Sequence, residues 1–302
     1  MAQDRPLLGI MLMLCFCVLA PLGDAVAKIL GQSIPLGQLL LVRFGVQALI
    51  LFPIVLLTHR PWIMRGRILR LTIWRTVLHI IGIGAMFTAL RYLPLADAVA
   101  IAFVMPFVML LLGKMVLGEE VGSRRIMACV VGFIGTLLVI KPSFAEVGLP
   151  ALLPLVVAVV FSLFMLITRQ IAKETDPISL QAVSGTMATV FILPLLLLGH
   201  PAGIVELQIV ETDLTTSSLM LFIGLLGTLA HLLMTWSLRY APSATLAPMQ
   251  YLEIPFATLI GLIIFGELPD GLAALGICIT IAAGLYIVIR ERAMSRAVPE
   301  VP

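Results

Sequence analysis

The sequence predicts an all-α integral membrane protein in which ten transmembrane helices form two inverted five-helix repeats. Three observations lead to this prediction. The 302 residues are 61% hydrophobic and only 12% charged. The apolar residues fall in continuous runs about as long as a membrane span. The phrase ALRYLP at 89–94 returns as SLRYAP at 237–242.

The composition excludes a water-soluble fold. The mean hydropathy of +1.15 lies far outside the range of soluble chains, and a soluble protein of this length needs a polar exterior that such a composition cannot supply. Runs such as AIAFVMPFVMLLLGKMVL approach the roughly 20 residues that cross the hydrocarbon core as a helix. Because the runs are continuous and not alternating, they favour helices over a transmembrane barrel.

Proline, glycine and charged residues divide the chain into ten expected spans, at 7–30, 35–57, 70–91, 95–117, 122–141, 149–172, 178–199, 216–238, 243–266 and 270–289. The first span is expected to be a retained helix and not a cleaved leader, since nine further spans follow. Four cysteines lie inside apolar runs without metal-ligand spacing: Cys15, Cys17, Cys129 and Cys278. We therefore expect them to pack, and predict no metal site and no cofactor.

Basic residues set the expected direction of the spans. They follow the even-numbered spans, as Arg60, Arg65, Arg67, Arg70, Arg124, Arg125, Arg169, Lys173, Arg239, Arg290, Arg292 and Arg296. The positive-inside rule assigns this side to the cytoplasm. The 200–215 loop on the other side carries three acidic residues and no Lys or Arg. Both termini are therefore predicted to be cytoplasmic.

The repeated phrase extends into a repeat of half the chain. Arg91 and Arg239 are 148 positions apart, and three more pairs keep this offset: Pro94 and Pro242, Gly118 and Gly266, Glu119 and Glu267. Pro106 and Pro255 agree after a slip of one residue. The sequence thus predicts two five-helix units at 8–141 and 150–290, joined near 142–148, and a cytoplasmic tail at 291–302.

Because five is an odd number, the second unit must enter the membrane from the opposite side. Two inverted units are typical of secondary transporters, in which exchanging the conformations of the two halves opens a central site to either side. A duplication retained only for packing is the alternative interpretation.

A family resemblance rests on this pattern. The short loop after ALRY, the proline-containing fourth span, and GEE or GEL before a glycine-rich fifth span (GFIGTLLVI and AAGLYIVI) resemble the EamA repeat of the drug/metabolite transporter superfamily. The resemblance implies a ten-helix carrier in the bacterial inner membrane, with a cavity lined by spans 1, 3, 4, 6, 8 and 9. GDAVAKIL and LLLVRFG are similar to members that handle riboflavin, S-adenosylmethionine or opine-type metallophores.

Charged residues within the spans are the first candidates for a substrate site, because a charge in the bilayer needs a partner or a function. Asp24 and Lys28 are one helical turn apart, acid first, which favours an ion pair. Arg43 on the second span is expected at a similar depth. The three residues predict either an ion-paired brace or a site in which Arg43 binds a substrate carboxylate or phosphate.

Glu253 lies near the middle of the ninth span, in PMQYLEIP. Pro255 just after it is expected to kink the helix and free carbonyl groups. Gln250, Tyr251 and Glu253 are therefore predicted to contact substrate. Desolvation of Glu253 would favour its protonated form, which makes it a candidate for proton coupling. A buried Glu that only bonds a neighbouring helix is the alternative.

Two histidines and a phenylalanine complete the candidates. His79 and His231 lie within spans three and eight, and either imidazole could titrate near neutral pH. His79 is predicted to contact substrate, and His231, like Asp24, to take part in proton coupling. Phe103 is predicted to stack on a ligand. Each of these side chains could instead serve only in packing.

These features predict a secondary carrier for a small polar or amphipathic organic metabolite, working by alternating access. A broad-specificity exporter is the main alternative, followed by a channel or a membrane scaffold. An enzyme is not expected, since we find no catalytic motif. The net charge of +3 and the absence of a basic run with aromatics give no indication of nucleic acid. The expected partners are a small molecule and the lipid bilayer; a monomer suffices, although a dimer is compatible.

Overall fold

The computed structural model describes residues 5–105, 107–108, 112, 123–241, 246 and 250–297. Regular structure within these residues is entirely helical. The α-helices are α1 (Pro6–Leu30), α2 (Leu36–Leu57), α3 (Gly66–Ala89), α4 (Leu95–Ala102), α6 (Ser123–Val147), α7 (Leu153–Ile171), α8 (Pro177–Gly199), α9 (Leu214–Tyr240), α11 (Glu253–Phe265) and α12 (Gly271–Ala297). Short 3-10 helices occupy Leu149–Leu152 and Val205–Leu207.

Within the residues that the structure describes, seven helical segments are long and apolar enough to cross a membrane. They are Leu7–Leu30, Leu36–Leu57, Gly66–Ala89, Val130–Val147, Leu149–Ile171, Pro177–Gly199 and Leu214–Tyr240. Shorter apolar helices occupy Glu253–Phe265 and Gly271–Ala283. The all-α class is therefore confirmed, with several membrane-spanning helices, whereas the count of ten spans stays a prediction.

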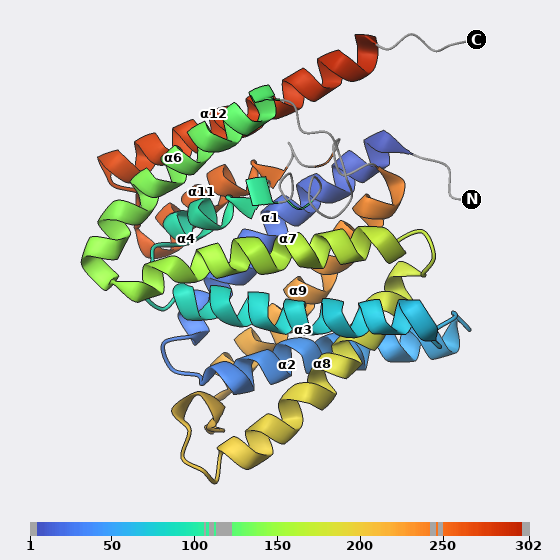
Figure 1. Ribbon diagram of the computed structural model, residues 1–302. Coiled ribbons are helices and arrows are strands. Elements are labelled where there is room, and N and C mark those ends of the chain that lie inside the picture. Colours follow the sequence, from blue (N-terminus) through green and yellow to red (C-terminus); the bar gives the residue numbers. More distant parts are fainter. Residues whose placement is uncertain are drawn as a thin grey trace, which may run out of the picture.

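Helices of the first half of the chain pack mainly against helices of the second half. The main pairs are α1 with α9, α2 with α8, α3 with α7, and α6 with α12. In Figure 1, α6 and α12 lie side by side at one flank of the bundle, and α2 and α8 lie at the other. The core is therefore shared between the two halves.

Two helices extend beyond their predicted ends. α6 continues past Lys141 to Val147, with Pro142 inside the helix. α12 continues to Ala297, so residues 291–297 of the predicted tail are helical. The segment ERAMSRA consists mostly of residues with high helix propensity, which explains the extension. Among the described residues, three helix starts are capped by the carboxylate of the preceding residue. Asp176 accepts from Ser179 N and Asp213 from Thr216 N, both at 3.0 Å, and Asp270 accepts from Ala273 N at 2.6 Å.

Spans four and nine were expected to be continuous helices, and the described parts are not. α4 ends at Ala102 and is followed by a turn at Phe103–Val104, and α11 begins at Glu253 after a turn at Tyr251–Leu252. Glu253 therefore stands at a helix N-terminus and not mid-helix. Pro255 lies in the first turn, where a missing N–H breaks no helical hydrogen bond. Four residues of the sequence alignment lie outside the described residues: Pro106, Gly118, Glu119 and Pro242.

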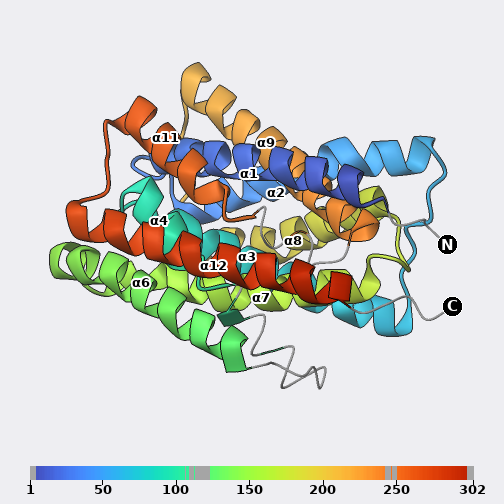
Figure 2. The ribbon, with the colours of Figure 1, turned by 90° about the horizontal axis from the view of Figure 1, so that it is seen from above.

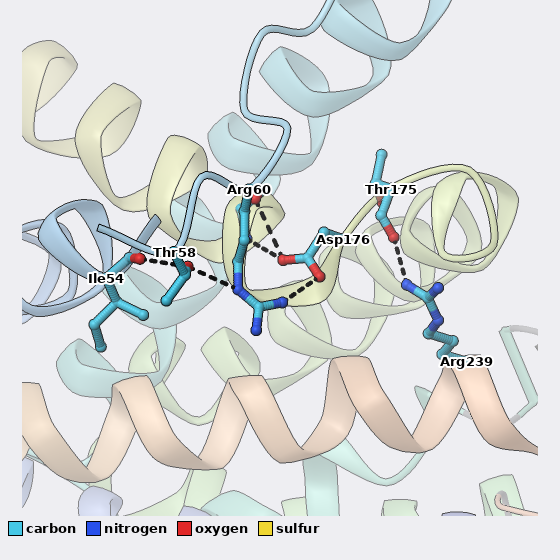
Figure 3. A network of polar contacts seen from close by, with 7 residues as sticks. Ile54, Thr58, Arg60, Thr175, Asp176 and Arg239 are labelled. Atoms are coloured by element: carbon cyan, nitrogen blue, oxygen red, sulfur yellow. Dashed lines mark hydrogen bonds and ion pairs between the residues drawn. The ribbon is translucent and has the colours of Figure 1, made fainter. Parts of the chain in front are cut away.

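The start of α1 and the end of α12 lie at the same end of the bundle (Figures 1 and 2). We call this the terminal end; it also holds the loops 58–65 and 172–176. Here Arg60 donates to Asp176 at 2.8 Å, and Arg239 donates to the Thr175 carbonyl at 2.8 Å (Figure 3). The contact of Arg60 with Asp176 joins loops of the two halves of the chain, whereas Arg239 joins α9 to a loop of the same half.

The opposite end of the bundle holds the loops 31–35, 90–94, 200–213 and 266–270. Arg91 donates to both carboxylate oxygens of Glu206, at 2.9 and 3.0 Å, and to the Ile34 carbonyl at 3.1 Å. Gln38 donates to the Val210 carbonyl at 2.9 Å and accepts from Val210 N at 2.8 Å. Polar contacts between the two halves therefore occur at both ends.

The contact between α6 and α12 depends on two glycines. A Cβ at Gly276 would lie 2.5 Å from the Gly135 carbonyl oxygen, and backbone atoms cannot move aside easily. Gly276→Ala is therefore expected to destabilise the protein by about 1–3 kcal/mol, measured as a lower Tm in detergent. Gly271→Ala is the matched control, because no atom lies within 4 Å of its Cβ position. Equal Tm values for the two variants would contradict this packing.

Candidate functional site

A cavity of about 110 Å³ lies between helices of both halves of the chain. Its lining residues come from α1, α2, α3, α4, α7, α9 and α11, and from Phe103, Met105 and Gln250. Most of them are apolar, including Phe16, Phe103, Phe161 and Met165. The charged side chains that line it, within the described part of the chain, are Asp24, Arg43 and Glu253. The cavity is thus an apolar chamber with a few ionisable groups.

Arg43 of α2 is the cation of the cavity, and its side chain is only 1% exposed. Nη1 donates to Gln47 Oε1 at 2.9 Å, and Nη2 lies 3.1 Å from His231 Nδ1 of α9. The guanidinium rests against the bare backbone of Gly227, where a Cβ would lie 2.2 Å from Nε. α2 and α9 can therefore position a buried guanidinium only because residue 227 has no side chain.

Two glutamines fix the surroundings of Arg43. Gln47 Nε2 donates to the Gln181 carbonyl at 2.7 Å. Gln181 Nε2 donates in turn to the His231 carbonyl at 2.9 Å and to Thr235 Oγ1 at 2.8 Å. This chain of hydrogen bonds connects α2, α8 and α9. Neither glutamine was predicted as a site residue from the sequence, although a polar amide within an apolar span already indicates a buried hydrogen-bonding role.

Asp24 of α1 and Glu253 of α11 supply the carboxyl groups of the cavity. Both side chains are half-buried, and neither forms a hydrogen bond or an ion pair with another described residue. Glu253 lies in the first turn of α11, where the helix dipole favours an anion. The cavity therefore holds acceptor groups that are free to bind a ligand.

The predicted ion pair between Asp24 and Lys28 is wrong. Lys28 lies in the last turn of α1, and its ammonium group reaches beyond the helix to the Glu267 carboxylate and to the Leu93 carbonyl, the latter at 2.9 Å. Glu267 also accepts from Leu95 N at 3.2 Å. The side chain thus leaves the apolar interior for the loops at the opposite end, so the expected brace of Asp24, Lys28 and Arg43 does not form.

The ion pair of Lys28 and Glu267 is expected to stabilise the fold. Because the side chains are only 13% and 30% exposed, a double-mutant cycle with Lys28→Met and Glu267→Gln should give a coupling energy of about 1 kcal/mol or more. The exposed pair of Arg67 and Glu174 is the control, with an expected coupling below about 1 kcal/mol. Unfolding measurements in which the effects of Lys28→Met and Glu267→Gln simply add would contradict the expected coupling.

Behind the cavity lies a second buried arginine that sequence analysis also missed. Arg75 of α3 donates from Nε to Thr168 and from Nη1 to Ser184, both at 2.8 Å. Its guanidinium lies 4.4 Å from the centroid of the Phe164 ring. Arg75 could have been predicted in the same way as Arg43, because it too is a charged residue within an apolar span. The structure places Arg75 among hydroxyl groups and an aromatic ring, outside the cavity lining.

The two predicted histidines lie together. Their ring centroids are 4.4 Å apart. His231 lines the cavity, whereas His79 is fully buried, packs on Phe44, Phe161 and Phe164, and does not line it. Neither ring nitrogen of His79 has a hydrogen-bond partner among the described residues. The prediction that His79 contacts substrate is therefore not supported, because its side chain does not reach the cavity.

The remaining candidates lie around the break between the short helices. Phe103 and Gln250 line the cavity, and Gln250 Nε2 lies 3.6 Å from Met165 Sδ. Tyr251 is buried and packs on Phe103, with ring centroids 5.5 Å apart, but does not line the cavity. Six of the eight predicted site residues thus line the cavity: Asp24, Arg43, Phe103, His231, Gln250 and Glu253.

The arrangement suits reversible binding. One guanidinium can hold a carboxylate with two parallel hydrogen bonds, two carboxyl groups can hold a cation, and aromatic rings can cover an apolar or planar group. Over the described residues no group of three His, Cys, Asp or Glu side chains could hold a metal ion. Binding a small molecule with charges of both signs is therefore the chemistry that the cavity offers.

The sequence matches the model of a known protein family. The model of the EamA-like transporter family matches the chain twice, over residues 7–141 and 148–290. These two matches cover nearly the whole chain.

Two curated relatives and one solved structure are similar to the chain. A riboflavin transporter of Rhizobium johnstonii is 29% identical over 239 residues, covering 79% of this chain and 74% of the relative. An S-adenosylmethionine uptake transporter of Rickettsia felis is 28% identical over 300 residues, covering 96% of each chain. A crystal structure at 16% identity has a TM-score of 0.62 and covers 95% of this chain and 97% of its own, a likeness of fold.

Proposed function

Because the chain belongs to the EamA-like transporter family, we propose that it is a secondary carrier for a zwitterionic or carboxylate-bearing organic metabolite. The observation that carries this proposal is the cavity in which Arg43 stands with Asp24 and Glu253 among aromatic and methionine side chains. The substrate carboxylate binds Arg43, its cationic group binds the carboxyl groups, and its apolar part lies against Phe103 and Phe161.

An inverted repeat of two five-helix units underlies the proposed mechanism. The breaks at 103–104 and 251–252 are separated by the repeat offset of 148 residues, and discontinuous helices at a central site are typical of such carriers. The pairing of α1 with α9 corresponds to that of α7 with α3 under the same repeat. These features support a ten-span carrier in the inner membrane with both termini in the cytoplasm.

Alternating access also fits the size of the cavity. A volume of about 110 Å³ is smaller than the roughly 300–1,000 Å³ of most small-molecule pockets. The lining helices are therefore expected to separate when substrate enters. The polar contacts at the two ends, such as Arg60 with Asp176 and Arg91 with Glu206, would break in turn as each end opens.

The relatives suggest which metabolites to test first. S-adenosylmethionine, carried by the Rickettsia relative, combines a carboxylate with cationic groups and an aromatic base. Riboflavin, carried by the Rhizobium relative, has a large aromatic ring system but no carboxylate. The charges of the cavity favour the first chemistry over the second.

Uptake into proteoliposomes tests the proposal. Purified protein would be offered radiolabelled S-adenosylmethionine, riboflavin, amino acids and an opine-type chelator. We expect saturable transport of at least one zwitterion, with riboflavin transported less, and loss of this transport in Arg43→Ala. Exposed Arg169 provides the control, since Arg169→Ala leaves the cavity intact. Transport of riboflavin alone, insensitive to Arg43, would contradict the proposed substrate class.

A further inference from the structure

One ring nitrogen of His231 faces two groups with opposite requirements. His231 Nδ1 lies 3.1 Å from Arg43 Nη2 and 3.0 Å from the Gly227 carbonyl oxygen. A guanidinium nitrogen only donates hydrogen bonds, and a carbonyl oxygen only accepts them. Nδ1 without a proton can accept from Arg43, and Nδ1 with a proton can donate to Gly227, but it cannot do both. The position of one proton therefore selects between two contacts.

The geometry keeps these contacts in competition. Arg43 and His231 are 1% and 6% exposed, so bulk water does not replace a lost contact easily. The α9 backbone at Gly227 closes one side of the guanidinium, and both side chains line the cavity. An anion that enters the cavity therefore reaches the guanidinium directly, next to the ring nitrogen.

The charges around His231 make protonation depend on a bound anion. Packed against the ring are the side chains of Phe16 from α1, Phe161 and Phe164 from α7, Arg43 from α2 and His79 from α3. Arg75 of α3 acts on the ring electrostatically, Gln181 of α8 bonds its backbone, and Asp24 and Glu253 line the same cavity. An imidazolium would meet a guanidinium at contact distance, and like charges disfavour each other. A carboxylate on Arg43 would neutralise that repulsion.

We propose that His231 couples substrate binding to proton binding. A substrate carboxylate at Arg43 draws Nη2 away from His231, and Nδ1 then takes one proton and donates it in a hydrogen bond to the Gly227 carbonyl. A hydronium ion in the water that fills the open side of the cavity supplies the proton: one O–H bond breaks, one N–H bond forms, and a neutral water molecule is left. At Arg43, one negative charge from the substrate carboxylate and one positive charge from the proton enter together, so the net charge around this guanidinium does not change. This step rests on the proposed carrier function.

The first test needs no substrate. Protein labelled with 15N-histidine in nanodiscs would be studied by NMR, with the His231 signals assigned by their loss in His231→Gln. In the wild-type protein we expect an unprotonated Nδ1. In Arg43→Met, which removes the donor and the charge, the Nδ1 signal should move to the protonated region while the Nε2 signal stays protonated, since uptake of a proton and not a change of tautomer is expected. Arg75→Met is the matched control, since Arg75 carries a nearby buried charge but does not bond His231, and Nδ1 should stay unprotonated.

Two results would overturn the coupling: an Nδ1 already protonated in the wild type, or an Nδ1 that stays unprotonated in Arg43→Met. Gly227→Ala provides a second route, because it displaces the guanidinium but keeps its charge, and should also protonate Nδ1. Proteoliposomes with an internal pH dye then separate the two proposals. If S-adenosylmethionine transport is accompanied by proton movement, and His231→Gln abolishes that proton movement, the result supports the coupling. Transport without proton movement refutes the coupling but not the carrier function. If none of the panel compounds is transported, the carrier function is refuted.

Discussion

Replacing Arg43 with alanine is expected to weaken the binding of a carboxylate-bearing substrate about 10- to 150-fold, as expected for the loss of hydrogen bonds to a charged group. Arg43 is the only Lys or Arg among the described residues that line the cavity. No other described cation can take over its role. Binding of radiolabelled S-adenosylmethionine to purified protein, by competition with unlabelled compound, measures the change in Kd.

Two comparisons separate recognition from folding in the Arg43 experiment. Arg43→Lys keeps the charge but loses the planar fork, so its affinity should lie between those of the wild type and Arg43→Ala. An analogue without the carboxylate should bind Arg43→Ala and wild type equally well. Because the alanine variant leaves a cavity and an unpaired Gln47 Oε1, its Tm should fall, and binding is compared at a temperature at which both proteins stay folded. An unchanged Kd for the intact substrate would remove Arg43 from the site.

Replacing both cavity carboxyl groups, in the double variant Asp24→Asn and Glu253→Gln, is expected to reduce transport of a zwitterionic substrate about 100-fold. Each charge-assisted contact to the cationic group contributes about 1.5–3 kcal/mol. Each single variant should therefore lose about tenfold or more. The amides keep the size of the side chains, so packing is preserved, and initial rates in proteoliposomes measure the effect.

The choice of substrate provides the control for the carboxyl groups. An anionic analogue that lacks the cationic group should be transported by the double variant at least as well as by the wild type. An exposed acid far from the cavity, Glu174, gives a neutral comparison in Glu174→Gln. Transport of the zwitterion that is unchanged in Glu253→Gln and Glu253→Ala would remove Glu253 from the mechanism.

Helix positions were largely predictable from the sequence because apolar runs of membrane length have few other structures open to them. α2, for example, was expected at 35–57 and spans Leu36–Leu57. The errors occur where local propensity or proline chemistry decides the outcome. α12 extends through a charged segment of good helix formers, and the expected kink at Pro255 is instead the first turn of a helix.

The side-chain contacts of the site were only partly predictable. A charge in an apolar span identified Arg43, Asp24 and Glu253, all of which line the cavity. Spacing along one helix, however, wrongly paired Lys28 with Asp24, because the preferred partner of Lys28 lies 239 residues away in the sequence. The contact between Arg43 and His231 depends on how α2 packs against α9, and no spacing rule contains that information.

Whether the cavity opens to each side of the membrane in turn can be tested by labelling one cysteine from both sides. Ala20 lines the cavity, and Ala20→Cys would be introduced after replacing Cys15, Cys17, Cys129 and Cys278 by alanine. In sealed vesicles, a membrane-impermeant maleimide should label this cysteine when added on either side, and saturating S-adenosylmethionine should slow the labelling. Labelling from one side only, with or without substrate, would contradict alternating access through this cavity.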